Sequence, residues 1–275
     1  MRYKIGEVAK ILDIPVETIR FYESKHLITP YKDPDSGYRY YTDKDINLLL
    51  DYKRFREMGF SLNESAEIMR QRDLNSFLGT LDEKIADAER LARFYQLKTI
   101  KLRNYKNVVE NIPLLIGEYQ EVIRPEGIMY INRRYRDGWV DYRSAAESDG
   151  VFASMMENIT FAENVYCIRQ EYLENDRATV EFDVGFTMKK RWADTFKVPD
   201  SPIIEHFSAV KSLYTVLKLD NPMYYSKVIF TDVLAYMEKR RMRLSGDIIG
   251  NQVTSVTDGD TKTRYVEVWI PFEKN

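Results

Sequence analysis

Apolar side chains recur at helical spacing in two short segments near the start of the chain, residues 5–12 and 16–23. Pro15 lies between them and suits the start of a helix, because its φ is already helical. On the second segment, Thr18 and Arg20 lie away from the apolar face. The pattern predicts two helices joined by a tight turn, the arrangement with which helix-turn-helix proteins place one helix in the DNA major groove. Two packed helices of an ordinary helical domain fit the same pattern.

A turn followed by a short alternating segment favours the DNA-binding alternative. Asp33-Pro34-Asp35-Ser36-Gly37 is rich in turn formers, and Tyr38-Arg39-Tyr40-Tyr41 alternates like a strand. An exposed strand with an arginine between aromatic residues suits phosphate contact together with packing. We therefore expect a winged helix-turn-helix, in which Arg20 contacts a base edge or a phosphate and Tyr22 reaches the DNA backbone.

Two capped helices follow the wing. Thr42 is placed to cap a helix that runs to about Met58, and Ser61 with Glu64 predicts the capping box of the next helix. The pattern thus predicts a helical end to the front segment, residues 1–72.

A heptad pattern runs through the middle of the chain. Ten positions follow alternating steps of three and four residues, and eight of them are apolar or aromatic: Leu78, Leu81, Ile85, Ala88, Ala92, Tyr95, Thr99, Leu102, Lys106 and Val109. No proline or glycine lies between Thr80 and Ile112, so we expect a helix of about 30 residues, ~45 Å long, that ends at Ile112-Pro113. The pattern predicts a coiled-coil dimerisation helix over residues 73–112, with a long solvated linker helix as the alternative.

The remaining residues, 113–275, divide into two similar halves. Each half has the order strand, helix, strand, strand, and each has a hairpin signal, at Asn175-Asp176 and at Asp258-Gly259-Asp260. The predicted elements cover 126–134, 142–159, 164–172 and 178–188 in the first half, and 203–219, 224–242, 247–256 and 263–272 in the second. The predicted fold class is α+β: a winged helix-turn-helix, a long helix and a duplicated antiparallel-sheet domain.

The amino-acid composition limits the kinds of site that we expect in this protein. With one cysteine and two histidines in 275 residues, neither a disulfide framework nor a thiolate metal site is expected, and we expect no cofactor. No apolar run approaches the ~18 residues that cross a bilayer, so we expect a cytoplasmic protein without membrane contact. No glycine-rich phosphate loop or nucleophile elbow is present, and Glu205 with His206 is more typical of a surface pair than of an acid–base catalyst. We expect a protein that is not an enzyme.

Residues 3–72 closely resemble the DNA-binding domain of MerR-family transcriptional regulators. The matching pieces are YKIGEVAKILDIPVETIRFYE, GYRYYTDKDI and REMGFSLNESAEI, in the family's order and spacing. Two positions depart from it, because Phe21 stands where tyrosine is common and Pro15 replaces a small polar cap. Together with the residue pattern, the resemblance implies DNA contacts from Lys4, Thr18, Arg20, Tyr22, Tyr38, Arg39, Tyr40, Arg54 and Arg56.

The same resemblance implies partners. Regulators of this family pair through antiparallel helices and grip an inverted repeat between promoter elements that are spaced too far apart. Distortion of that DNA, at a cost of order 1–6 kcal/mol for smooth bending, aligns the elements for RNA polymerase. We therefore expect a homodimer on double-stranded promoter DNA.

The rear half resembles the GyrI-like effector-binding domain of multidrug-sensing MerR-family regulators, most closely in TRYVEVWIPFEK. That domain holds a carboxylate in an aromatic cleft, and such a carboxylate suits a lipophilic cation. Alternation places Tyr265, Glu267 and Trp269 on one strand face, so Glu267 is the first candidate for the acid; an exposed glutamate on a sheet face is the alternative. A second acid of the multidrug sensors is missing from residues 248–251. Glu181 is the other candidate, and the walls are expected from Tyr166, Tyr172, Tyr214, Tyr224 and Tyr225.

These features predict a regulator that activates transcription when a small lipophilic effector binds its rear domain. Two alternatives stay open: a constitutive or protein-responsive DNA-bending regulator without a small-molecule ligand, and a detoxifying hydrolase fused to a DNA-binding module.

Overall fold

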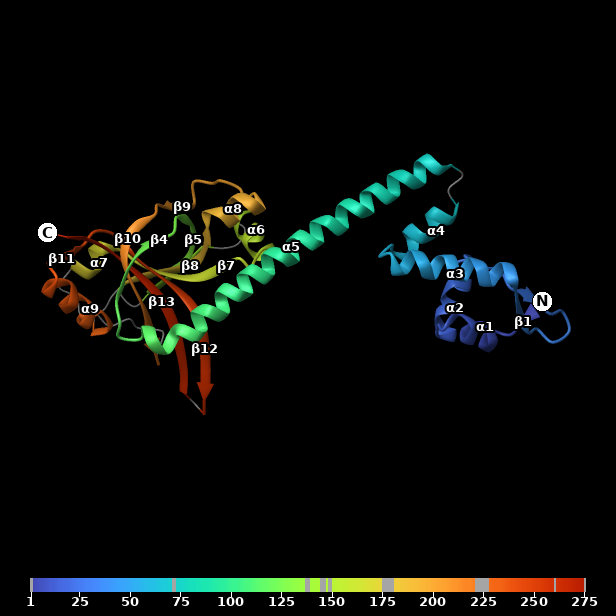
Figure 1. Cartoon of the computed structure of the whole chain (residues 1–275), viewed down its shortest axis with the longest axis horizontal. Helices are drawn as coiled ribbons and strands as arrows, with labels where there is room; N and C mark the ends of the chain where they lie inside the picture. The colour runs from blue at the N-terminus through green and yellow to red at the C-terminus, as the bar shows by residue number, and fades with distance from the viewer. Residues whose placement is uncertain are drawn as a thin grey trace. The chain divides into compact units, whose positions relative to one another are not determined.

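The computed structural model describes residues 2–70, 73–136, 139–143, 147, 150–174, 181–220, 228–259 and 261–274. The chain forms two compact units, Met1–Tyr95 and Gln96–Asn275 (Figure 1). In the described part of the chain, no helix combines the length and the apolar character needed to cross a membrane.

The front unit is a helical domain with a small sheet. Its elements are β1 (Arg2–Tyr3), α1 (Ile5–Leu12), α2 (Val16–Ser24), β2 (Tyr31–Lys32), β3 (Arg39–Thr42), α3 (Asp43–Glu57) and α4 (Leu62–Arg70). The sheet has the order β1-β3-β2, and all its pairs are antiparallel. Val8, Ile19, Tyr41 and Leu49 are fully buried between the helices and β3. The predicted helices and wing are confirmed.

Capping explains where the front helices begin. Thr42 accepts from the Asp45 N–H (3.4 Å), while the Asp45 carboxylate accepts from the Thr42 N–H (2.7 Å). Ser61 and Glu64 form the same reciprocal pair at the start of α4. Lys53 donates to the Leu12 carbonyl (2.8 Å), which fixes α3 against the end of α1.

The long helix α5 (Leu74–Leu115) contains 42 residues. Its predicted end at Ile112-Pro113 is wrong, because the helix continues through Pro113 to Leu115. Ile112 and Leu115 pack with Val216, and the Thr215 hydroxyl donates to the Leu115 carbonyl (2.9 Å). This packing holds the last turn, where proline removes only one backbone hydrogen bond.

The rear unit is built on a 10-stranded sheet of order β4-β10-β13-β12-β7-β8-β5-β6, with β9 paired to β5 and β11 to β13. Its strands are β4 (Gln120–Arg124), β5 (Gly127–Arg136), β6 (Trp139–Tyr142), β7 (Ala162–Ile168), β8 (Phe182–Lys189), β9 (Ile204–Phe207), β10 (Val210–Leu219), β11 (Met242–Leu244), β12 (Ile248–Asp258) and β13 (Thr261–Lys274). Its helices are α6 (Val151–Glu157), α7 (Gln170–Glu174), α8 (Lys190–Phe196) and α9 (Val228–Lys239).

The predicted duplication is confirmed. The unit β5-α6-β7-β8 repeats as β10-α9-β12-β13, and the two copies join where β7 pairs with β12. At this seam between the halves Val165 lies opposite Asn251, and Cys167 opposite Ile249. The predicted hairpin at Asp258 joins β12 to β13. The centre of the sheet is therefore the place where side chains from both halves meet.

Several predicted boundaries in the rear unit are wrong. The strand expected over 164–172 ends at Ile168, because α7 begins at Gln170, where the backbone N–H donates to the Asp247 carboxylate (3.0 Å). The described part of the helix expected over 142–159 is only Val151–Glu157. The helix expected over 224–242 ends at Lys239, and the chain then pairs with β13 as β11. The turn signal at Asn175-Asp176 lies outside the described residues.

Candidate DNA interface and effector cavity

The second helix presents part of the expected DNA-reading face. On α2, Arg20 is exposed and Thr18 is half-buried. Tyr22 is only 6% exposed, and its ring stacks on that of Tyr52, with ring centroids 5.4 Å apart; its contact with the DNA backbone stays a prediction. Tyr22 is a core residue because it lies one turn after Ile19 on the apolar side of the helix.

The wing is preorganised by its own turn. The Asp33 carboxylate accepts from the Ser36 backbone N–H and from the Ser36 hydroxyl, each at 2.8 Å, and these bonds hold the Asp33 pKa below its usual value. Gly37 has a φ of +68°, which glycine adopts without strain. Tyr38 is exposed and Tyr40 half-buried.

Arg39 at the wing is linked to the reading helix. Its Nε lies 2.6 Å from the Glu23 carboxylate, and its side chain remains 58% exposed. The pair neutralises part of the arginine charge in the free protein, but the guanidinium remains accessible to a phosphate.

The other expected basic contacts have partners too. Arg54 pairs with Asp51 (2.5 Å), and Arg56 donates to the Phe60 carbonyl (2.7 Å) across the connection from α3 to α4. Lys4 is exposed at the start of α1. None of these contacts removes the positive charge from the surface.

A cavity of about 350 Å³ lies in the rear unit against the second half of α5. Side chains of α5, β7, β8, α8, β12 and β13 line it, from both halves of the duplicated sheet. Its lining comprises Lys101, Leu102, Asn104, Tyr105, Val108, Ile159, Thr160, Ala162, Glu163, Asn164, Phe186, Lys189, Arg191, Trp192, Gln252, Val253 and Glu267. Its volume is within the range of small-molecule sites.

Glu267 is the buried acid of this cavity. Its side chain is nearly inaccessible, with 8% of the residue exposed, so the alternative of an exposed glutamate does not hold. Burial first, and then the neighbouring Glu163 charge, raise the pKa of Glu267 to about 7. The Tyr214 hydroxyl donates to its carboxylate (2.9 Å) and opposes this rise.

A second acid, which the sequence reasoning missed, lies beside Glu267. Glu163 on β7 forms an ion pair with Lys101 of α5, and its other carboxylate oxygen accepts from the Asn251 amide (2.6 Å). Asn251 in turn accepts from the Thr187 hydroxyl (3.1 Å). Glu163 and Asn251 belong to different halves of the sheet, so no local pattern places them together. The strand alternation around Glu163 was the only signal available.

Most of the expected aromatic walls lie elsewhere. Tyr166 donates to the Gln252 side chain (2.9 Å), Tyr172 packs under the Arg136 guanidinium (4.5 Å), and Tyr265 packs near the end of α5. Trp269 lines a small neighbouring cavity of about 20 Å³. Tyr224 and Tyr225 lie outside the described residues. The aromatic lining comes instead from Tyr105, Phe186 and Trp192.

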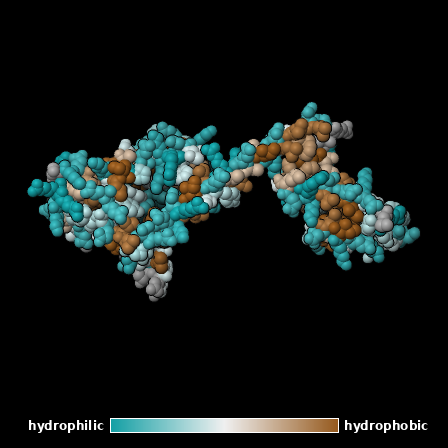
Figure 2. Space-filling view, in the orientation of Figure 1, coloured by the Kyte–Doolittle hydropathy of each residue, from teal (hydrophilic) through white to brown (hydrophobic). Residues whose placement is uncertain are grey.

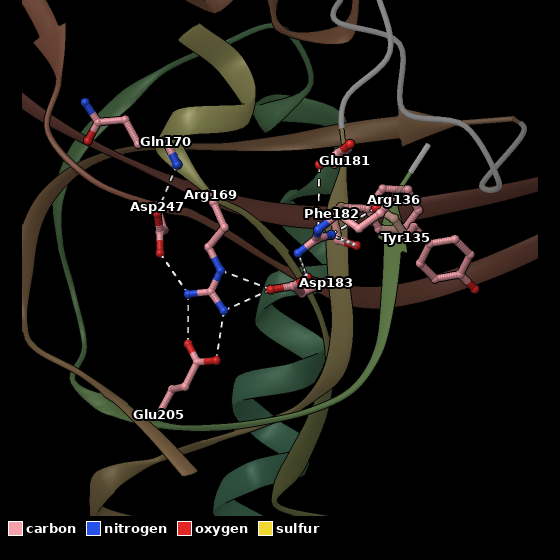
Figure 3. A network of polar contacts seen from close by, with 9 residues as sticks. All are labelled: Tyr135, Arg136, Arg169, Gln170, Glu181, Phe182, Asp183, Glu205 and Asp247. Atoms are coloured by element: carbon pink, nitrogen blue, oxygen red, sulfur yellow. Dashed lines mark hydrogen bonds and ion pairs between the residues drawn. The ribbon is translucent and has the colours of Figure 1, made fainter. Parts of the chain in front are cut away.

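Glu181, the second candidate acid, belongs to a different cluster (Figure 3). It lies 3.6 Å from Arg136, which also contacts Asp183 (2.5 Å). Arg169 joins the same buried Asp183 (2.9 Å) to Glu205 (2.8 Å) and to Asp247 (3.0 Å). This network joins β5, β8 and β9 to the residue before β12, so we interpret it as structural. No group of side chains suited to hold a metal ion is found in the described ranges.

Comparisons with known proteins agree with the helix-turn-helix interpretation of the front unit. Residues 3–72 match the model of the MerR HTH family regulatory proteins. The HTH-type transcriptional regulator CueR of Escherichia coli O157:H7 is 38% identical over 91 residues, which are 31% of this chain and 67% of that protein. The mercuric resistance operon regulatory protein of Bacillus cereus is 30% identical over 112 residues, which are 41% of this chain and 76% of that protein.

A cryo-EM structure of an EcmrR–DNA complex covers 99% of this chain and 100% of its own at 17% identity, with a TM-score of 0.37, too low for a structural conclusion. Both sequence relatives are named as regulatory proteins. The chain belongs to the MerR family of DNA-binding transcriptional regulators.

Proposed function

We propose that this protein is a ligand-responsive regulator that binds promoter DNA as a homodimer and activates transcription when a small lipophilic effector occupies the rear cavity. The observation that carries the proposal is the 350 Å³ cavity with Glu267 buried in its wall. Burial of a carboxyl group at this depth costs stability, and such groups are common at functional sites.

The homodimer is supported by α5. Its heptad positions Leu78, Ile85, Tyr95 and Leu102 are each 55% exposed in the single chain. Apolar side chains along this helix reach the surface (Figure 2). A stripe of this kind on a 42-residue helix is stabilised by a second copy of the same helix.

The contribution of α5 to the cavity wall supports a response of the regulator to a ligand. Lys101, Leu102, Tyr105 and Val108 of α5 form one wall of the cavity, and the Tyr105 hydroxyl donates to the Val253 carbonyl (3.0 Å). A ligand in the cavity therefore touches the helix that carries the heptad stripe. Such a ligand shifts the regulator toward one state only if it binds that state better.

Tryptophan fluorescence tests the ligand part of the proposal. Trp192 lines the cavity and Trp269 adjoins it, so saturable quenching by a lipophilic compound is expected. The full-length protein is titrated with a panel of charged and neutral aromatic compounds, and compounds that quench are added to a transcription reaction on the regulated promoter. A panel without saturable quenching favours a constitutive or protein-responsive regulator.

A further inference from the structure

The cavity carries more positive than negative charge. Among its lining residues, Lys101, Lys189 and Arg191 are basic, whereas Glu163 and Glu267 are acidic. A lipophilic cation, which suits the buried carboxylate of the multidrug sensors, is favoured by an excess of negative charge. The lining charges of this cavity do not provide that excess.

One acid is already paired within the protein. Glu163 contacts the Lys101 ammonium with one oxygen and accepts from Asn251 with the other. Both side chains of the ion pair are mostly buried, at 17% and 20% exposed. The pair contributes no net charge, and its carboxylate has no oxygen left without a partner.

The other acid keeps its proton to a higher pH than an ordinary glutamate. Burial and the Glu163 charge raise the pKa of Glu267 to about 7, against the opposing effects of Tyr214, Lys189 and Lys101. Tyr214 donates to one of its oxygens (2.9 Å). In the protonated form the Glu267 hydroxyl is itself a hydrogen-bond donor toward a ligand.

Two further cations, Lys189 and Arg191, line the cavity. No described carboxylate forms a direct ion pair with either, although the Lys189 charge lowers the pKa of Glu267. The Arg191 guanidinium lies 4.5 Å from the Trp192 ring centroid, so its N–H groups stay available at the edge. The adjacent Lys190 differs: it pairs with Glu126 (3.6 Å) and does not line the cavity.

We propose that the effector is an amphipathic aromatic anion, whose acidic group is held by Lys189 and Arg191 and whose apolar body packs on Phe186 and Trp192. This inference rests on the proposed function, because it names the chemical class of the effector. Carboxylates and sulfonates on an aromatic frame have this chemistry. Their negative charge offsets the positive charge of Lys189 and Arg191, and their rings pack against the apolar wall of the cavity.

Two ions of equal shape and opposite charge test the charge class. Tetraphenylborate and tetraphenylphosphonium are titrated into the full-length protein by isothermal calorimetry in sodium buffers. The expected result is that the borate binds at least about tenfold more tightly than the phosphonium. Equal affinity, or tighter binding of the phosphonium, overturns the anion assignment and leaves the small-molecule function standing. Absence of binding by both ions overturns both proposals.

Variants of two adjacent lysines test whether the preference for the borate over the phosphonium arises in the cavity. Lys189→Gln is expected to reduce the borate preference about fivefold to tenfold, whereas Lys190→Gln on the neighbouring exposed residue leaves it unchanged. An equal effect of the two variants would mean that the net charge of the protein, and not the cavity, sets the preference. That result overturns the role of Lys189.

Discussion

Substitution of Glu267 by glutamine gives the sharpest physical test of the cavity. In the folded protein the pKa of this carboxyl group is about 7, against an ordinary value of 4.5. The folded state therefore binds a proton between these pH values, whereas the unfolded state has already lost it. The free energy of unfolding contributed by Glu267 is highest below pH 4.5 and falls as the pH rises through 7.

The expected magnitude follows from the two pKa values. Each pH unit between them changes the free energy of unfolding by about 1.4 kcal/mol, so the ionised carboxylate destabilises the folded protein by about 3 kcal/mol above pH 7. Between pH 5.5 and pH 8 the wild-type protein should lose about 2 kcal/mol through this group. Glutamine does not ionise, so Glu267→Gln should lack this loss and be the more stable protein at pH 8.

Urea unfolding followed by tryptophan fluorescence measures this difference. All three tryptophans, Trp139, Trp192 and Trp269, lie in the rear unit, so the signal reports that unit. Glu273→Gln is the matched control, because Glu273 lies on the same strand but is exposed and pairs with Arg243. If wild type and Glu267→Gln lose the same stability between pH 5.5 and pH 8, then Glu267 is not a desolvated acid.

Three further substitutions test other parts of the molecule. Asp183→Asn leaves the guanidinium groups of Arg136 and Arg169 without their buried partner, and should lower the free energy of unfolding of the rear unit by about 3–5 kcal/mol in the same urea assay; a loss below 1 kcal/mol would mean that the network is dispensable. Arg39→Ala should weaken binding to most DNA sequences and reduce the salt slope by about one, and unchanged affinity in a fluorescence anisotropy titration contradicts the wing contact. Ile85→Asp, at an exposed heptad position, should convert the dimer into a monomer in sedimentation velocity without loss of helix content; a persistent dimer rejects the α5 pairing.

Local signals were sufficient for the front of the chain. The break at Pro15, the turn at Asp33 and the capping residues Thr42 and Ser61 act within a few residues, so the sequence alone predicts α1 to α4. Tyr22 is expected at the DNA backbone, and local spacing does not reveal that its ring stacks on Tyr52.

The duplication of the rear unit was predictable from the sequence, but the ends of its strands and helices were not. Alternation located the long strands, because burial of one face imposes a period of two residues. The short elements β11 and α7 depend on partners far along the chain, Phe272 for Leu244 and Asp247 for Gln170. Contacts of that kind leave no periodic signal in the sequence.

The alternating pattern of one strand can identify a buried acid, but it does not show which residues of other elements surround that acid in the cavity. Alternation placed Tyr265, Glu267 and Trp269 on one face of β13, yet only Glu267 lines the main cavity. Tyr265 packs near the end of α5, and Trp269 lies beside the cavity of about 20 Å³. Whether a strand residue lines a cavity depends on the register of several neighbouring strands and on the elements that pack over them. The charges from which we infer the ligand class lie on α5, β7, β8 and α8, so the strand that carries the acid does not by itself indicate the ligand's charge.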